Sequence, residues 1–276
     1  MQTQHLMAAF IGLVLLVSGC GSKLDNDFGG SPDYLTGEVL YPEKARLKCI
    51  YVTHYGGGRH LDISQIDPED VYIASEYEYD ASGRIGKVSS PMYDNGSVSG
   101  LYSYDLYIYD SNNRLEKKES YHSNTGGFIN LQNTTYFYGN SGEKIKEQTD
   151  YPQTGNLCKS EYTLFEYANK RLVKCERYEC RQLTDYVVFE YNADGENIAE
   201  KRYDSDGVLY STTKHAYIDG LNVKSEVYQG NADSGKWREI NRIYDKNKNL
   251  IYLQSEELSP LSSATSFLSI YEYEKQ

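Results

Sequence analysis

The stretch Tyr79-Asp-Ala-Ser-Gly-Arg-Ile85 decides the fold. It combines the end of one β-strand, a tight turn and the start of a second strand. Asp80 can bond the turn backbone through its side chain, and Gly83 can adopt the left-handed conformation that a three-residue hairpin loop requires. The preceding residues 76–79 read Glu-Tyr-Glu-Tyr, which is the period-two alternation of a strand. The segment therefore predicts a β-hairpin.

The same pattern recurs along the chain. Copies lie at 106–115, 135–145, 165–172, 189–198, 216–221 and 242–251, with a degenerate copy at 52–61. Taking the last tyrosine before each turn as an anchor gives Tyr55, Tyr79, Tyr109, Tyr138, Tyr167, Tyr191, Tyr217 and Tyr244. The anchors are 24 to 30 residues apart, and a final Tyr-Glu-Tyr at 271–273 begins the pattern again. Fixed periods of this length are the signature of repeat architectures.

Tyrosine dominates the composition, with 29 Tyr against 7 Phe and 1 Trp in 276 residues. Tyrosine buries well only where its hydroxyl reaches water or a partner, so this composition favours a thin core. Outside the first twenty residues, no window shows a sustained helical period. We therefore predict an all-β fold, an antiparallel meander of about eight β-hairpin repeats that forms an open, curved, solenoid-like sheet.

The motif Tyr-Asp-x-x-Gly-Arg-Ile at 79–85 resembles the YD repeat of RHS-type proteins. The resemblance is close at 76–85 and 106–115 and loose over the rest of 46–273. It implies that hairpins stack into a spiralling sheet in which the Tyr and Asp are structural. No toxin-like segment follows the repeats and the array is short, so we expect an open sheet and no enclosing shell. A shared fold would imply no function by itself.

The N-terminus predicts export and a lipid anchor. Residues 6–17 are apolar or small, too few to span a bilayer but suited to the core of a signal peptide. Val17-Ser-Gly-Cys20 follows and resembles the lipobox of bacterial lipoproteins, in which the cysteine is lipidated. We predict a signal peptide over 1–19, lipidated Cys20 and a flexible tether over 20–45, and a repeat domain over 46–276. The alternative is an ordinary cleaved signal with a chance cysteine.

Charge and flanking residues predict the location. Lys23-Leu-Asp-Asn-Asp27 resembles the acidic surface-export signal of some lipoproteins, and Gly21 stands where an inner-membrane retention signal would have Asp. We therefore expect a lipid-anchored protein of the bacterial outer membrane, exposed at the cell surface. The net charge of −12 argues against nucleic-acid partners and against electrostatic binding to anionic lipid.

Four further cysteines could form disulfides in this oxidising location. A tight turn at 168–171 would bring Cys158 nearly opposite Cys180 and Cys175 near Leu164, so we predict a Cys158–Cys180 bridge. A one-residue change of register would remove that prediction. No metal site is expected, because the cysteines lack zinc-ligand spacing and two nearby histidines, His54 and His60, make a poor site alone.

No catalytic signature stands out, and the informative residues recur, whereas a catalytic residue is usually unique. We therefore predict a non-enzymatic binding or scaffold protein without cofactor, which contacts a glycan, a peptide or another envelope protein. The candidate binding face is the row of aromatic residues Tyr77, Tyr79, Tyr107, Tyr109, Tyr136, Tyr138, Phe165, Tyr167, Phe189 and Tyr191. These residues could equally be ordinary cross-strand pairs. The alternative function is a glycan hydrolase with paired carboxylates in a groove of the sheet.

The lipid anchor can be tested directly. Replacing Cys20 with Ala removes the acyl acceptor, so we expect the protein to move from the membrane fraction to the soluble fraction. Immunoblots of the separated fractions measure this. Unchanged membrane association of the Cys20→Ala protein would contradict lipidation.

Overall fold

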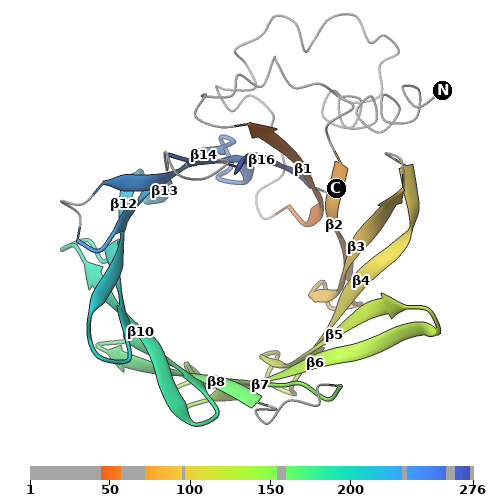
Figure 1. Ribbon diagram of the computed structural model, residues 1–276, viewed down its shortest axis with the longest axis horizontal. Helices are drawn as coiled ribbons and strands as arrows, with labels where there is room; N and C mark the ends of the chain where they lie inside the picture. Colours follow the sequence, from red (N-terminus) through yellow and green to blue (C-terminus); the bar gives the residue numbers. More distant parts are fainter. Residues whose placement is uncertain are drawn as a thin grey trace, which may run out of the picture.

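The computed structural model describes residues 45–56, 72–94, 97–153, 160–231, 235–258 and 265–273. These residues form sixteen antiparallel strands that close into a barrel (Figure 1). The prediction of an open, solenoid-like sheet is therefore wrong, although the all-β meander of hairpins is present. The strands are β1 (Leu47–Gly56), β2 (Tyr72–Tyr79), β3 (Ile85–Asp94), β4 (Ser97–Tyr109), β5 (Leu115–Asn124), β6 (Gly127–Tyr138), β7 (Lys144–Asp150), β8 (Ser160–Ala168), β9 (Arg171–Glu179), β10 (Gln182–Tyr191), β11 (Asn197–Asp204), β12 (Leu209–Ile218), β13 (Leu221–Gln229), β14 (Lys236–Tyr244), β15 (Leu250–Glu257) and β16 (Thr265–Tyr273).

The predicted signal peptide at 1–19, Cys20 and nearly all of the tether lie outside the described residues, so these assignments stay predictions. Within the described part of the chain, no helix is long and apolar enough to cross a membrane. Buried apolar side chains are few among the described residues, and several buried positions hold Ser or Thr. The core is thin, as the tyrosine-rich composition predicts.

The turn of the repeat has the predicted geometry. Asp80 Oδ1 accepts hydrogen bonds from the backbone N–H groups of Ser82 and Arg84, each at 2.9 Å. Gly83 has a φ of 78°, and the Asp80 Oδ2 atom pairs with the Arg84 guanidinium at 2.7 Å. These contacts hold the pKa of Asp80 below its ordinary value, chiefly through the backbone N–H of Arg84. Two backbone–backbone bonds close the turn, from Asp80 N–H to the Arg84 carbonyl at 2.8 Å and from Gly83 N–H to the Asp80 carbonyl at 2.9 Å. The same pair recurs in the turns that begin at Asp110, Gly139, Asn192, Asp204 and Asp245.

Each hairpin carries a β-bulge beside its anchor tyrosine. In the first hairpin Tyr79 pairs with Ile85 and Glu78 with Lys87, which leaves Gly86 as the extra residue. Equivalent register shifts precede Tyr109, Tyr138, Tyr167, Tyr191, Tyr217 and Tyr244. A bulge bends its strand and increases local twist, and repeated bulges are a means of curving a sheet toward closure. The repeat therefore contains the curvature that closes the barrel.

The anchor tyrosines link consecutive hairpins. Tyr109 ends β4, and its hydroxyl donates a hydrogen bond of 2.9 Å to the carbonyl of Ile85 at the start of β3. Seven more tyrosines do the same with the carbonyl of the first or second residue of the preceding strand, at 2.7 to 3.0 Å: Tyr79 to Leu47, Tyr138 to Leu115, Tyr167 to Lys144, Tyr191 to Leu172, Tyr217 to Asn197, Tyr244 to Asn222 and Tyr273 to Leu250. We call these eight residues the anchor tyrosines.

The arginine of the motif completes the link. The Arg84 guanidinium lies 4.4 Å from the centroid of the Tyr109 ring, and Arg114 lies 4.6 Å from the Tyr138 ring. A cation over an aromatic face is attracted by the ring quadrupole. Each residue named in Tyr-Asp-x-x-Gly-Arg therefore has a structural role in its own turn or at the next hairpin.

The barrel closes through a repeat that is split between the two ends of the repeat domain. Tyr273 pairs with Leu47 and Glu272 with Cys49, which leaves Lys48 as the extra residue in the same register shift. Arg46 lies 5.4 Å from the Tyr79 ring, the position that Arg84 takes over Tyr109. The terminal half-copy at 271–273 is thus completed by residues 46–52. Tyr55, predicted as the first anchor, instead lies near the end of β1 that is remote from Leu47.

A matched pair of tyrosines tests the anchor bond. Tyr138→Phe removes one hydroxyl that bonds a neighbouring strand, so we expect a loss of about 1 kcal/mol in the free energy of unfolding. Tyr136→Phe removes a hydroxyl that has no partner among the described residues and should change stability little. Urea unfolding followed by fluorescence measures both. Equal losses in the two variants would contradict the structural role of the anchor.

Candidate functional site

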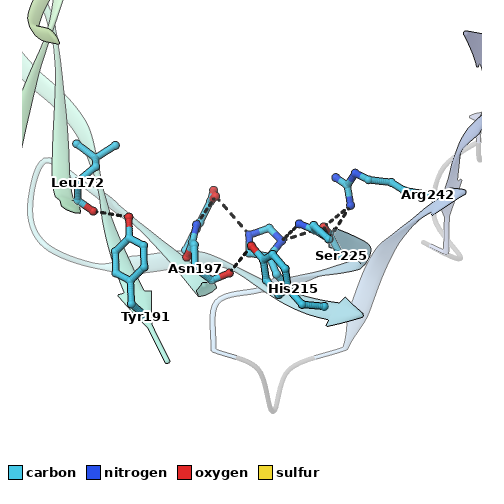
Figure 2. Close-up of polar contacts among 9 residues, drawn as sticks. Leu172, Tyr191, Asn197, His215, Ser225 and Arg242 are labelled. Carbon is cyan, nitrogen blue, oxygen red and sulfur yellow. Dashed lines mark hydrogen bonds and ion pairs between the residues drawn. The ribbon is translucent and has the colours of Figure 1, made fainter. Parts of the chain in front are cut away.

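A ring of side chains runs around the barrel two residues before each anchor tyrosine. The strand register places these side chains on the same face as the anchors. We call this ring the belt, and it consists of Tyr77, Tyr107, Tyr136, Phe165, Phe189, His215, Arg242 and Tyr271. Figure 2 shows His215 and its neighbours on the concave side of the curved sheet, so the belt lies on the inner face of the barrel.

The belt tyrosines differ from the anchors in their hydrogen bonding. Tyr77, Tyr107, Tyr136 and Tyr271 are partly buried, yet their hydroxyls have no hydrogen-bond partner among the residues the structure describes. Burial raises the pKa of both Tyr107 and Tyr136 to about 12. These hydroxyls remain protonated at neutral pH and can donate to, or accept from, a bound molecule.

The predicted binding face therefore separates into two sets with different roles. Tyr79, Tyr109, Tyr138, Tyr167 and Tyr191 are anchors whose hydroxyls are occupied by the backbone of the preceding strand. Tyr77, Tyr107, Tyr136, Phe165 and Phe189 belong to the belt. The period-two pattern places both sets on one face, but only the last tyrosine before the turn reaches the neighbouring carbonyl.

The opposite face repeats a Lys-x-Glu-x-Tyr pattern. Glu119 accepts hydrogen bonds from Lys117 at 2.6 Å and from the Tyr121 hydroxyl at 2.9 Å, and the Tyr121 ring stacks on Tyr104. The strands β9 and β13 repeat this arrangement at Glu176 and Glu226. Lys236, Tyr228 and Lys224 lower the pKa of Glu226 to about 2.

These charged triads indicate whether the outer face of the barrel suits contact with lipid or with water. A membrane-spanning β-barrel presents a continuous apolar band on its outward face. Lys117, Glu119, Lys174 and Glu176 instead lie in the middle of their strands on the outer face. Both faces of the described barrel therefore suit contact with water.

A polar cluster interrupts the belt where β11 to β14 meet (Figure 2). His215 Nδ1 lies 2.9 Å from Ser225 Oγ and 3.1 Å from Asn222 Nδ2, and His215 Nε2 lies 3.3 Å from Glu200 Oε1. Arg242 Nη1 donates to Ser225 Oγ at 2.8 Å and to Asn222 Oδ1 at 3.0 Å. The cluster thus connects the two belt positions that hold neither Tyr nor Phe.

The hydrogen bonds fix the orientation of the His215 ring. Arg242 can only donate, so the Asn222 atom that it contacts is the carbonyl oxygen, and the amide nitrogen of Asn222 faces His215. His215 Nδ1 therefore accepts, and its Nε2–H donates to Glu200. This Glu200 contact is the first cause of the lowered pKa of that carboxyl.

The anchor bonds position this cluster. Tyr217 donates to the carbonyl of Asn197, and Tyr244 donates to the carbonyl of Asn222. The side chains of the same two asparagines bond Glu200 and His215. The cluster is therefore built on backbone that the repeat already holds in place.

Glu200, His215 and Ser225 have the composition of a catalytic triad, but their geometry does not suit nucleophilic catalysis. Ser225 is only 1% exposed, so a substrate carbonyl could not approach its hydroxyl. The ring nitrogen that faces Ser225 also accepts from Asn222, which competes with proton abstraction. The arrangement supports a fixed polar surface rather than a nucleophile.

The cysteine predictions are only partly covered by the structure. Cys180 is disulfide-bonded, but Cys158 lies outside the described residues, so the Cys158–Cys180 pairing stays a prediction. Cys175 has a free thiol, pairs across the strands with Phe165, and has its pKa raised by burial. The described residues contain no group of three or more His, Cys, Asp or Glu side chains arranged to hold a metal ion.

Sequence reasoning missed His215 and Arg242. Both were visible in the sequence, because His215-Ala-Tyr217 and Arg242-Ile-Tyr244 occupy the positions where other copies read aromatic-x-Tyr. Aligning the copies residue by residue would have shown two polar substitutions in an aromatic column. Their proximity in space follows from the order of the strands, which places β12 and β14 on either side of β13.

No protein-family model and no curated protein matches this chain, so membership of the YD-repeat family is not supported. Among solved structures, a chain of the Photorhabdus luminescens Tc holotoxin pore is 12% identical with a TM-score of 0.32, over 89% of this chain and 10% of its own length. Porin-like proteins of Bacteroides uniformis and Bacteroides vulgatus are each 10% identical, with TM-scores of 0.35 and 0.36. These matches cover 85% and 83% of this chain and 98% and 100% of theirs.

Scores of this size do not establish a common fold, and no property of those proteins is carried over to this chain. The chain spans about a tenth of the holotoxin component that it matches. The described residues form a closed sixteen-stranded antiparallel β-barrel with an aromatic belt and one polar cluster on its inner face.

The His215–Glu200 contact predicts a pH dependence of stability. Because the pKa of Glu200 is lowered in the folded state, its contribution is present above the ordinary value of 4.5 and is lost as the pH falls through the folded pKa. We expect Glu200→Gln to unfold at lower urea than the natural protein at neutral pH, with the difference shrinking below pH 4.5. Urea midpoints across this range measure it.

Glu116→Gln provides the control, since Glu116 is an exposed carboxylate at the bulge of β5. This variant should match the natural protein at every pH. A constant difference between Glu200→Gln and the natural protein at all pH values would contradict the assigned role of the carboxylate.

Proposed function

We propose that this protein is a non-catalytic binding barrel, lipid-anchored at the bacterial outer membrane through Cys20. Its ligand is a glycan, a peptide or a segment of another envelope protein, and it contacts the belt on the inner face. The observation that carries this proposal is the unused hydroxyls of Tyr77, Tyr107, Tyr136 and Tyr271, which contrast with the eight occupied anchor hydroxyls.

Two physical arguments support a ligand on this face. Barrels of sixteen strands are generally too wide for side chains to fill, and they leave an interior that water or a ligand can enter. Aromatic rings with a polar tip offer both a stacking surface and a hydrogen-bonding group. Such rings suit ligands that are themselves part apolar and part hydroxylated.

The charged outer face supports a lipid anchor at Cys20. A barrel with Lys-x-Glu-x-Tyr triads on its outer strands gains nothing from insertion into lipid, so residence at a membrane requires a separate attachment. Acyl chains on Cys20 would supply it, and the intervening residues up to 45 would hold the barrel clear of the bilayer.

The second candidate function is a glycan hydrolase, which the proximity of Glu200 and His215 favours. A carboxylate and an imidazole in contact can exchange a proton with a substrate. Glycoside hydrolysis ordinarily uses two carboxyl groups, whereas the polar cluster contains one, Glu200, which weighs against this candidate. Incubating oligosaccharides with the natural protein and with Glu200→Gln would test it, since cleavage that disappears in the variant would establish an enzyme.

Glycan and peptide arrays test the binding proposal. A soluble Cys20→Ala protein should bind members of at least one array, and adding Tyr107→Ala with Tyr136→Ala should abolish that binding because both belt rings are lost. Adding Tyr121→Ala, which removes a ring from the outer face, is the matched control and should leave binding unchanged. Binding lost equally in both variants, or absent from the start, would contradict the proposal.

A further inference from the structure

The belt changes from aromatic to cationic at one position. Arg242 on β14 occupies the site that Tyr77, Tyr107 and Tyr136 occupy in other repeats. The chain as a whole is acidic, with 40 Asp and Glu residues and a net charge of −12. A buried or partly buried arginine is therefore expected to find a carboxylate partner. Arg242 has none among the described residues.

The hydrogen bonds of Arg242 leave one edge of its guanidinium available. Its hydrogen bonds within the described residues, to Ser225 Oγ and Asn222 Oδ1, are both made by Nη1. The Nε and Nη2 groups have no partner among the residues that the structure describes. These two groups form the fork that binds a carboxylate through two parallel hydrogen bonds. The Nη1 contacts hold the fork in one orientation, which reduces the entropy lost on binding.

The nearby acid does not neutralise this fork. Glu200 is engaged by His215 Nε2 at 3.3 Å and by Asn197 Nδ2 at 3.1 Å. Two further arginines lie on the inner face, Arg202 on β11 and Arg238 on β14. Glu257 is opposite Arg238 across the strands, and Arg202 contributes to the lowered pKa of Glu200 after the His215 contact. No carboxylate pairs with Arg242 among the described residues.

A belt ring with an unused hydroxyl lies on β16, two strands from the arginine on β14. Tyr271 on β16 is partly buried, and the positive charge of Arg242 opposes the rise that burial causes in its pKa. Both side chains belong to the belt, and only β15 separates their strands. A ligand that spans the width of β15 would contact the Arg242 fork and the Tyr271 ring together.

We propose that Arg242 receives the carboxylate of an acidic saccharide, whose sugar ring lies against the aromatic belt. This inference rests on the proposed function and names the class of its ligand. A uronic acid carries a carboxylate on a hydroxylated ring, so it matches the fork, the aromatic surface and the free hydroxyls together. A peptide carboxylate would use the fork but would leave most of the belt hydroxyls unpaired.

Matched ligands test the carboxylate. Calorimetry should compare an oligogalacturonate with its methyl ester, which keeps the sugar rings and removes the charge. With soluble Cys20→Ala protein, we expect the acid to bind at least about tenfold more tightly than the ester, the discrimination typical of one charge-assisted pair. Adding Arg242→Gln should remove this preference, so that both ligands bind with the weaker affinity.

Two further variants test whether a change in binding comes from the Arg242 fork or from a general effect of removing a positive charge. Arg242→Lys keeps the charge without the fork and should retain only part of the preference. Lys214→Gln removes the same charge from the outer face of β12 and should retain all of it. Circular dichroism on each variant checks that the barrel is intact.

The outcomes separate the two proposals. Equal binding of acid and ester, with Arg242→Gln unchanged, would overturn the carboxylate inference and leave a belt that binds neutral sugars. Failure of both saccharides to bind would overturn the saccharide assignment. A peptide with a free C-terminal carboxylate that binds instead would identify a peptide ligand for the belt.

Discussion

The structure depends on one hydrogen bond made eight times, from the anchor tyrosine hydroxyl to a carbonyl at the start of the preceding strand, in its first or second residue. Main-chain ladders pair every strand with its neighbours, including the strands of consecutive hairpins. The tyrosine bond adds a side-chain link between consecutive hairpins at one rim of the barrel. A chain with few buried aliphatic side chains can therefore be ordered by polar contacts that recur at regular intervals.

The same periodicity positions the candidate site. The belt lies two residues before each anchor tyrosine in the same strand. The anchor bond therefore fixes the position of each belt side chain along the barrel axis and its direction toward the interior. Substituting a belt residue changes the chemistry of the inner face without disturbing the scaffold. His215 and Arg242 show this, since their strands keep the anchor bonds of Tyr217 and Tyr244 while their side chains form a polar cluster.

The sequence predicted the hairpins, the turn chemistry and the tyrosine rows, because each is determined by residues a few positions apart. Closure of the barrel could not be predicted in this way, because it is determined by two segments more than two hundred residues apart. Arg46-Leu47 is the second half of a motif that lacks its Tyr-Asp, and Tyr271-Glu-Tyr273 is a first half that lacks its turn. The site escaped for a related reason, since His215 and Arg242 are informative only when compared with the equivalent position in every other repeat.

The split repeat has a consequence for how the chain folds. Pairing β1 with β16 joins the segments furthest apart in the described sequence, so loop-closure entropy makes this contact slow to form. Until the last strand is available, the growing sheet has two unpaired edges, which are templates for association with other chains. Because the chain is synthesised from its N-terminus, one edge of β1 has no partner strand until β16 has been made. The pairing of β1 with β16 therefore forms last. Both exposed edges of the sheet are covered only when all sixteen strands are present.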